Sequence, residues 1–204
     1  MLNTQIFCKA LKFVAHAAGK RDLRYYLCGV RLEWVGDTLD LVGTDGCRLA
    51  WVSLRTQSPS AAPVAVTLGN ADVKNIMSSM GKDKGVLSLF VEVPADPAKP
   101  PRAAITAGGV TLNCAGLEGV YPQWRRVIPG QRLNHELPRM DVHRLAGMLA
   151  AIAPFCGKVG KDAAPVAVTA GPEAKSTAVT FRPEAIHEPD TLDVLGVIQS
   201  LNKE

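Results

Sequence analysis

Aromatic residues are scarce in this chain of 204 residues, at 5 % of the total, so its hydrophobic core must be mainly aliphatic. The excess of charge is also small, because 23 lysines and arginines stand against 19 aspartates and glutamates. A formal net charge of +4 permits contact with nucleic acid without requiring it. No apolar run approaches the ~20 residues of a membrane-spanning helix. Lys9 and Lys12 interrupt the apolar residues near the N-terminus, unlike a secretory signal peptide, so we predict a cytoplasmic protein.

Motifs of catalysis and metal binding are missing as well. The five cysteines are odd in number and none stands in a CxxC spacing, which argues against a disulfide framework or a zinc site. The four histidines have no HExxH spacing, and there is no GxSxG, P-loop or GxGxxG motif. We therefore predict a non-catalytic protein without a metal or cofactor. Asp45, in a Thr-Asp-Gly sequence, is interpreted as a turn residue rather than a catalytic acid.

The hydrophobic pattern predicts a unit of one helix and three strands, followed by a second copy of the same order. Thr4 is the expected cap of the first helix and Asn70 that of the second. The first unit is a helix over 4–18 and strands over 24–35, 38–43 and 47–54, with turns at Gly36-Asp37 and Thr44-Asp45-Gly46. A strand over 63–68 leads into the second unit, which is a helix over 70–80 and strands over 86–93, 102–107 and 110–115, with a turn at Gly108-Gly109.

A third, shorter unit is expected after a polar linker at 129–137. Asp141 is the expected cap of a helix that ends before Pro154. The remaining elements are a helix over 141–153, a hairpin of strands 165–170 and 177–182 around Gly171-Pro172, and a final helix over 190–202. The predicted fold is α+β, with antiparallel sheets, helices on one face and repeated helix-plus-strands units. We predict a complete domain over 1–129 and a truncated one over 130–204.

Three segments carry a resemblance to a known family. Residues 24–33 (RYYLCGVRLE) and 41–50 (LVGTDGCRLA) resemble the middle domain of the bacterial DNA polymerase III beta subunit, the replicative sliding clamp, and residues 119–129 (GVYPQWRRVIP) resemble its segment between middle and last domains. The block over 24–50 and the block over 119–129 stand in the family's order at a similar separation. The sequence looks like a shortened form, with the middle domain and a truncated last domain, in which 190–202 resembles the last domain's second helix. The implied fold is the DNA-clamp fold.

The resemblance implies a DNA-facing surface on the helices and on the loop after the first helix. A solvated helix face is the alternative interpretation of the same basic residues. A clamp must hold phosphates without reading bases, and lysine and arginine suit that task. The expected DNA-binding residues are Lys9, Lys12, His16, Lys20, Arg21, Arg24, Tyr25, Tyr26, Lys74 and Arg144, with His143 beside them.

The resemblance also implies a pocket for short peptides from polymerases and other partners, formed by the TDG turn and the linker. Apolar walls and two arginines at the edge suit a peptide. Cys47 stands where the family usually has histidine, and the family's C-terminal strands after the last helix have no counterpart. The expected peptide-binding residues are Leu27, Thr44, Gly46, Cys47, Arg48, Leu49, Pro122, Arg126 and Val127.

Two functions follow as hypotheses from the resemblance. The first is a sliding-clamp-like processivity factor, a homo-oligomer that holds a DNA polymerase on duplex DNA, binds other proteins with clamp-binding motifs and is handled by a clamp loader. The alternative is a clamp-like peptide-binding module that does not encircle DNA and regulates or diverts replication proteins. An unrelated small α+β enzyme is the least favoured interpretation.

Overall fold

Two antiparallel sheets form the frame of the protein in the computed structural model, which describes residues 1–96, 98–128, 142–155, 166–170, 178–183 and 191–199. The strands are β1 (Leu2–Asn3), β2 (Gly29–Thr44), β3 (Arg48–Gly69), β4 (Val86–Glu92), β5 (Arg102–Ala107), β6 (Val110–Ala115), β7 (Val166–Ala170), β8 (Ala178–Pro183) and β9 (Thr191–Gln199). One sheet has the order β1-β4-β5-β6 and the other β2-β3-β9-β8-β7. The antiparallel α+β prediction is confirmed.

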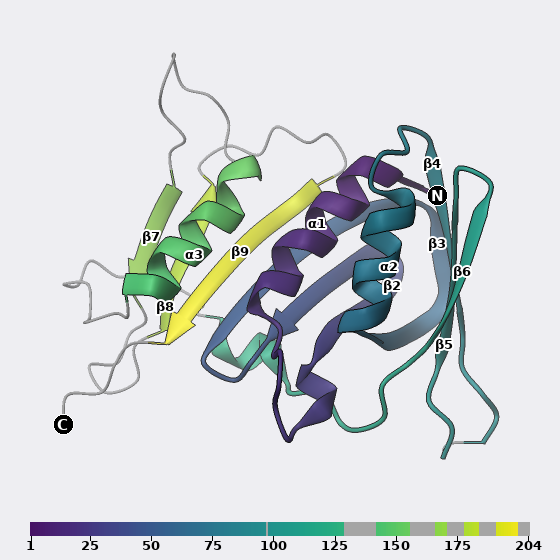
Figure 1. Ribbon diagram of the computed structural model, residues 1–204, viewed down its shortest axis with the longest axis horizontal. Helices are drawn as coiled ribbons and strands as arrows, with labels where there is room; N and C mark the ends of the chain where they lie inside the picture. Colours follow the sequence, from purple (N-terminus) through teal and green to yellow (C-terminus); the bar gives the residue numbers. More distant parts are fainter. Residues whose placement is uncertain (97, 129–141, 156–165, 171–177, 184–190, 200–204) are drawn as a thin grey trace.

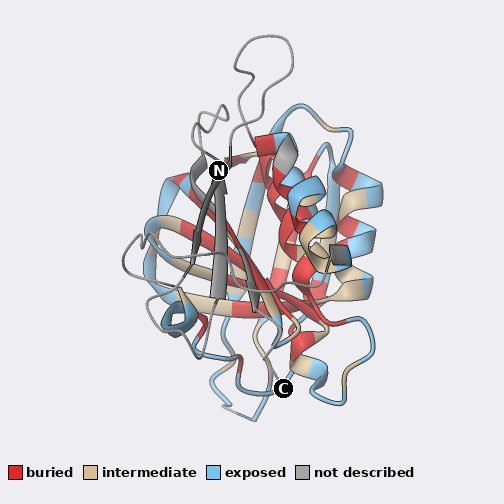
Figure 2. Ribbon diagram, turned by 90° about the vertical axis from the view of Figure 1, so that its left-hand side faces the viewer, coloured by how far each residue is buried: buried red, intermediate tan, exposed pale blue. Residues whose placement is uncertain are grey.

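Three helices lie side by side in front of the sheets: α3 (Val142–Ile152), α1 (Thr4–Ala17) and α2 (Asn70–Met80) (Figure 1). α1 is central and packs on β2 and β3, whereas α3 packs on β9 and β8. The apolar side of α1 is almost wholly buried, with Phe7, Leu11 and Phe13 at 2 % exposure or less. The helices thus bury one face against the sheets and expose the other (Figure 2). Among the described residues, no helix has the length and apolarity to cross a membrane.

The predicted caps of α1 and α2 are each wrong by one residue. Asn3 caps α1, since its side chain accepts a hydrogen bond from the Ile6 N–H at 3.1 Å. The Thr4 hydroxyl instead donates to the Gly85 carbonyl. At α2 the cap position is Gly69, and the Asn70 amide donates to the Gly19 carbonyl at 2.7 Å. The two polar side chains that the sequence predicted as caps therefore form hydrogen bonds to distant carbonyl groups instead.

The Gly36-Asp37 turn lies inside β2. The strand runs on through the turn, whereas the sequence predicted two separate strands. Its residues 29–34 pair with 64–69 of β3 and its residues 38–44 pair with 49–55, with the register shifting between. Gly36 has φ +57°, a left-handed conformation that glycine adopts at little cost. The chain reverses at this turn. A straight strand would hold Glu33 and Asp40 about 23 Å apart, but the guanidinium of Arg125 contacts both of them. The two predicted strands over 47–54 and 63–68 likewise belong to the single long strand β3.

The predicted strand over 24–35 is wrong at its start. Tyr25–Leu27 form a 3-10 turn, η1, and β2 begins at Gly29. The Gly19 N–H donates to the Leu27 carbonyl at 2.8 Å, and the Leu27 N–H donates to the Arg24 carbonyl at 2.8 Å. These hydrogen bonds close the loop after α1. Tyr25–Leu27 therefore lie in a turn, although their side chains are typical of strands.

The predicted final helix over 190–202, and its likeness to a second helix of the family's last domain, is wrong. Thr191–Gln199 form strand β9, which pairs antiparallel with residues 48–54 of β3. Leu195 lies on one face of the sheet, and Gly196 faces α3, where an added Cβ would lie 2.5 Å from the Met148 sulfur. The alternation of a strand therefore prevails over the three-residue spacing of leucines.

The other expected elements are confirmed within one or two residues where the structure describes them. The expected linker over 129–137, the cap at Asp141 and the turn at Gly171-Pro172 lie outside the described residues. β9 continues the sheet that β2 and β3 begin, so the division into domains at residue 129 stays a prediction.

Candidate nucleic-acid and peptide interfaces

The outer face of the three helices is basic. Lys9, Lys12 and Lys74 are exposed, and Arg144 is half-buried. Asp72 is the single acidic residue in the sequences of α1, α2 and α3. Because the helices lie side by side (Figure 1), these basic residues share one surface over the part of the chain that the structure describes. Such a surface attracts phosphates over long range without reading bases.

The loop after α1 extends this surface. Lys20, Arg21 and Tyr25 are exposed, whereas Tyr26 packs against apolar residues on the other side of the sheet. Arg24 donates to both carboxylate oxygens of Asp22, at 2.8 and 3.0 Å, and these hydrogen bonds lower the pKa of Asp22 to about 2. Arg24 also donates to the Asp45 carbonyl at 3.2 Å, so the loop is tied to the TDG turn.

His16 lies at the junction of α1 and α3 rather than on the open face. Its Nε2 atom is buried, and an added Cβ on Gly147 of α3 would lie 2.8 Å from it. Burial lowers the pKa of His16 most, the charges of Arg48 and Lys20 lower it further, and Asp45 opposes them. The surroundings of His16 thus disfavour its charged form and bury its Nε2 atom, so it is a poorer phosphate ligand than the lysines on the same helix.

A change of His16 to glutamine is expected to flatten the dependence of stability on pH. Because the pKa is lower in the folded state than the unfolded value of about 6.5, the unfolded chain binds more protons below that pH. The contribution of His16 to stability is present above pH ~6.5 and is lost as pH falls through the folded pKa. Urea unfolding between pH 5 and 8 measures this. His143→Gln, on the exposed face of α3, is the matched control and should keep the decline of the wild type.

The turn that the sequence predicted at Thr44-Asp45-Gly46 is confirmed, and the structure shows that its own side chains build it. The Thr44 hydroxyl donates to the Arg48 carbonyl at 2.7 Å and accepts from the Gly46 N–H. The Asp45 carboxylate accepts from the Cys47 and Arg48 N–H groups at 2.9 and 3.0 Å, and pairs with the Arg48 side chain. Gly46 has φ +88°, which favours glycine. Cys47 is exposed at the tip.

Behind this turn lies a second apolar cluster, on the face of the sheet opposite the helices. It contains Leu27, Val42, Leu49, Tyr121, Trp124 and Leu195. Leu27 and Leu49 are 0 % and 3 % exposed, so they are not the open pocket walls that the sequence predicted. The reason is that Tyr121, Trp124 and Leu195 cover them. The two leucines and the buried Thr44 lie beneath the predicted site. The exposed residues around it are Gly46, Cys47, Pro122, Arg126 and Val127.

Residues 117–128, the cover segment, are fastened over this cluster. The Tyr121 hydroxyl donates to the Val42 carbonyl at 3.2 Å, and burial raises the Tyr121 pKa well above its usual range. Trp124 begins a 3-10 turn, η2 (Trp124–Val127), and its ring lies 5.3 Å from that of Trp51. Arg125 then contacts both Glu33 and Asp40.

The sequence did not single out Trp51, Tyr121, Trp124 and Arg125 as site residues. The aromatic residues between Gly119 and the linker were the one available signal.

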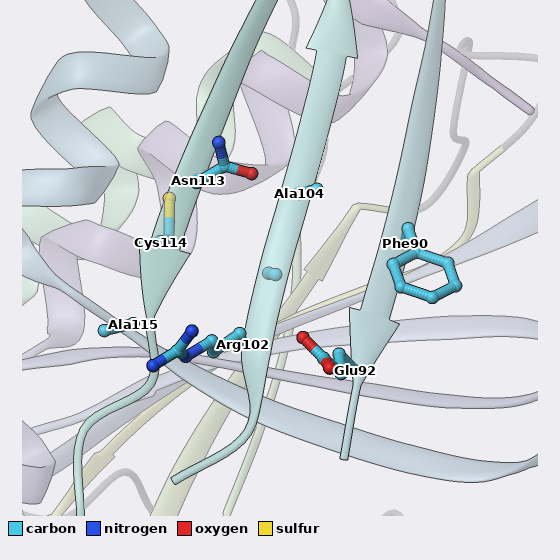
Figure 3. Close-up of a pocket in the computed structure, with 8 residues that line it drawn as sticks. Phe90, Glu92, Arg102, Ala104, Asn113, Cys114 and Ala115 are labelled. Atoms are coloured by element: carbon cyan, nitrogen blue, oxygen red, sulfur yellow. The ribbon is translucent and has the colours of Figure 1, made fainter. Parts of the chain in front are cut away.

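A shallow hollow of about 340 Å³ lies elsewhere, on the outer face of β4, β5 and β6 (Figure 3). Phe90 and Asn113 stand on its two sides and Ala104 between them, with Glu92 and Arg102 at one end. Phe90 is 66 % exposed. None of the site residues predicted from the sequence lines it, so it is separate from both interfaces described above.

Comparison with known proteins gives one family. The model of the "DNA polymerase III beta subunit, central domain" matches residues 1–123. A curated relative, "Beta sliding clamp" of Pseudomonas aeruginosa, is 30 % identical over 113 residues, which cover 55 % of this chain and 29 % of that protein. The "Beta sliding clamp" of Salmonella typhimurium is 29 % identical over 134 residues, covering 65 % and 34 %.

Solved structures share the fold at lower identity. The DNA polymerase III subunit beta of Pseudomonas aeruginosa has a TM-score of 0.73 at 19 % identity, over 99 % of this chain and 66 % of that chain. The subunit from Thermotoga maritima has a TM-score of 0.74 at 12 % identity, over 100 % and 65 %. The chain spans about a third of the length of the curated relatives named above. Since the family model covers more than half of the sequence, the chain belongs to the DNA polymerase III beta subunit family, through that family's central domain.

Proposed function

We propose that this chain is a sliding-clamp-like processivity factor, which holds a DNA polymerase on duplex DNA in the cytoplasm and performs no catalysis itself. The observation that carries the proposal is the basic outer face of α1, α2 and α3, with one acidic residue among three helices that lie side by side. Lys9, Lys12, Lys20 and Lys74 supply charge toward phosphates, and Arg21, Arg24 and Tyr25 extend the surface along the loop. Arg144 contributes from a half-buried position, whereas Tyr26 packs on the other side of the sheet and is left out of this surface.

Partner peptides dock, in this proposal, where the TDG turn meets the cover segment. Cys47, Pro122, Arg126 and Val127 form the accessible rim, with the half-buried Arg48 beside them, and Val127 is 51 % exposed. A sliding clamp from Pseudomonas aeruginosa has been solved bound to griselimycin, and we expect that compound to bind here too. An apolar ligand group gains about 25 cal/mol per Å² removed from water on such a surface.

Several copies of the chain form the clamp, with residues 1–129 and 130–204 each counting as one clamp-like domain. The edge strands of the two sheets support this, because β6 ends one sheet and β7 ends the other. An unpaired edge is a template for a strand of another chain, and such head-to-tail contacts close into a ring or continue as a filament. Three chains would supply six such domains. A clamp loader is the expected partner for opening a ring.

The experiment is light scattering together with retention on nicked circular DNA. A ring gives a mass of several chains and stays on a circle at a salt concentration that removes unlinked protein. Cutting the circle once should release it, because a linear duplex has ends. A monomer that binds griselimycin but is released equally from circular and linear DNA would exclude the clamp mechanism and leave the non-encircling peptide-binding module.

A further inference from the structure

We infer that Arg125 is a positioning residue of the peptide site: its guanidinium fixes the cover segment on the sheet and so places Pro122, Arg126 and Val127 for a ligand. This role rests on the proposed function, since it supposes that the exposed side of the cover segment receives partner peptides. Arg125 itself points to the sheet and was not among the residues predicted from the sequence.

The contacts of Arg125 form a closed network. One terminal nitrogen donates to Glu33 Oε2 and the other to Asp40 Oδ2, both at 2.5 Å. Its carbon Cζ lies 4.1 Å from the centre of the Trp124 ring. The same carboxylates accept from the indoles, Asp40 from Trp51 at 2.9 Å and Glu33 from Trp124 at 3.3 Å. The residues of β2 before and after Gly36 thus meet the cover segment at a single side chain, and Trp51 of β3 joins this network through Asp40.

The planar fork of arginine is required for this arrangement. It spans two carboxylates and stacks on an indole at once, whereas a lysine ammonium offers one point charge. The Glu33 and Asp40 side chains are 20 % and 11 % exposed, so without Arg125 two like charges would face each other away from bulk water, with Arg31 still paired to Glu33 at 3.4 Å. Arg126 and Val127 follow in the same 3-10 turn, so displacement of Arg125 moves them directly.

The apolar contacts of Tyr121 and Trp124 remain when Arg125 is lost, because both side chains are buried in the second cluster. The cover segment is then expected to stay near the sheet but to lose its fixed register. That separates positioning from folding: Arg125→Met should stay folded, with a lower Tm because Glu33 and Asp40 lose the cation that they share, while its peptide site loses its order.

Calorimetric titration with griselimycin tests this role on the full chain. Arg125→Met should weaken binding by about tenfold or more, and Arg125→Lys should restore only part of it. Arg55→Met is the matched control, since Arg55 is exposed and its ion pair is with Asp37 at the turn of β2. Amide hydrogen exchange across residues 121–128 should rise in Arg125→Met and not in Arg55→Met.

A second pair of variants distinguishes positioning from direct contact with the ligand. If Arg125 acts through the network, Asp40→Asn also weakens griselimycin, and the double variant binds no more weakly than Arg125→Met alone. If Arg125 touched the ligand itself, Asp40→Asn would leave affinity unchanged or raise it, and the role would be overturned. Wild-type affinity in Arg125→Met overturns the role alone, whereas absence of binding in the wild type overturns the proposed function and the role with it.

Discussion

Replacing Lys9, Lys12 and Lys74 together by glutamine is expected to lower the affinity for duplex DNA by up to about 2.7 orders of magnitude at 0.1 M monovalent salt. Each lysine that neutralises a phosphate releases a condensed counterion, and each such contact adds ~0.9 to the slope of log affinity against log salt. All three side chains are exposed on α1 and α2, so the fold should remain unchanged. Fluorescence anisotropy over a series of salt concentrations measures both the affinity and the slope.

The control for this variant removes the same amount of positive charge from a different part of the surface. Arg55, Lys99 and Arg102 are exposed on β3, in the β4–β5 loop and on β5. Changing these three to glutamine removes the same formal charge from sites away from the helix face. We expect the slope to fall for the helix variant and to stay near the wild-type value for the control. Equal slopes in the two variants would show that DNA senses net charge alone, and the helix face would not be the binding surface.

Elements with local signals were predictable from the sequence. The turn at Gly108-Gly109 and the alternation on either side of it give β5 and β6 with their observed bounds, because neighbouring strands need no distant partner to define them. β9 was not predictable. Its leucines fit a helix as well as a strand, and its strand state depends on β3, which is more than a hundred residues away in the chain.

The site divides in the same way. The TDG turn is local, so its residues and their bonds follow from the sequence. The network of Arg125 joins positions 33, 40, 51 and 125, which come together only after the sheet forms. The sequence also did not show whether the face of the sheet on which a strand residue lies is open or covered. Leu49 was expected in an open wall, but its burial depends on which segment covers that face of the sheet.

Gly43→Ala is expected to destabilise the protein by about 3 kcal/mol or more, at the upper end of the effect of overpacking a core. A Cβ on Gly43 would lie 1.9 Å from the Val14 carbonyl oxygen and 2.8 Å from its carbonyl carbon. Both atoms belong to the backbone of α1, so no side-chain rotation can relieve the clash. The helix must move away from β2, or the strand must bend. Either movement opens the core that Phe7, Leu11 and Phe13 fill.

Gly36→Ala separates the effect of space from that of backbone conformation. Gly36 has φ +57° but nothing lies within 4 Å of an added Cβ, so its cost is the left-handed conformation alone, about 1–2 kcal/mol. A loss of 3 kcal/mol corresponds to a decrease in Tm of about 6–12 °C for a protein of this size. Thermal unfolding followed by circular dichroism should rank wild type above Gly36→Ala and Gly36→Ala above Gly43→Ala. If Gly43→Ala unfolds within 2–3 °C of the wild type, α1 does not rest on β2 at this position, and the basic face that it carries would have to be placed differently.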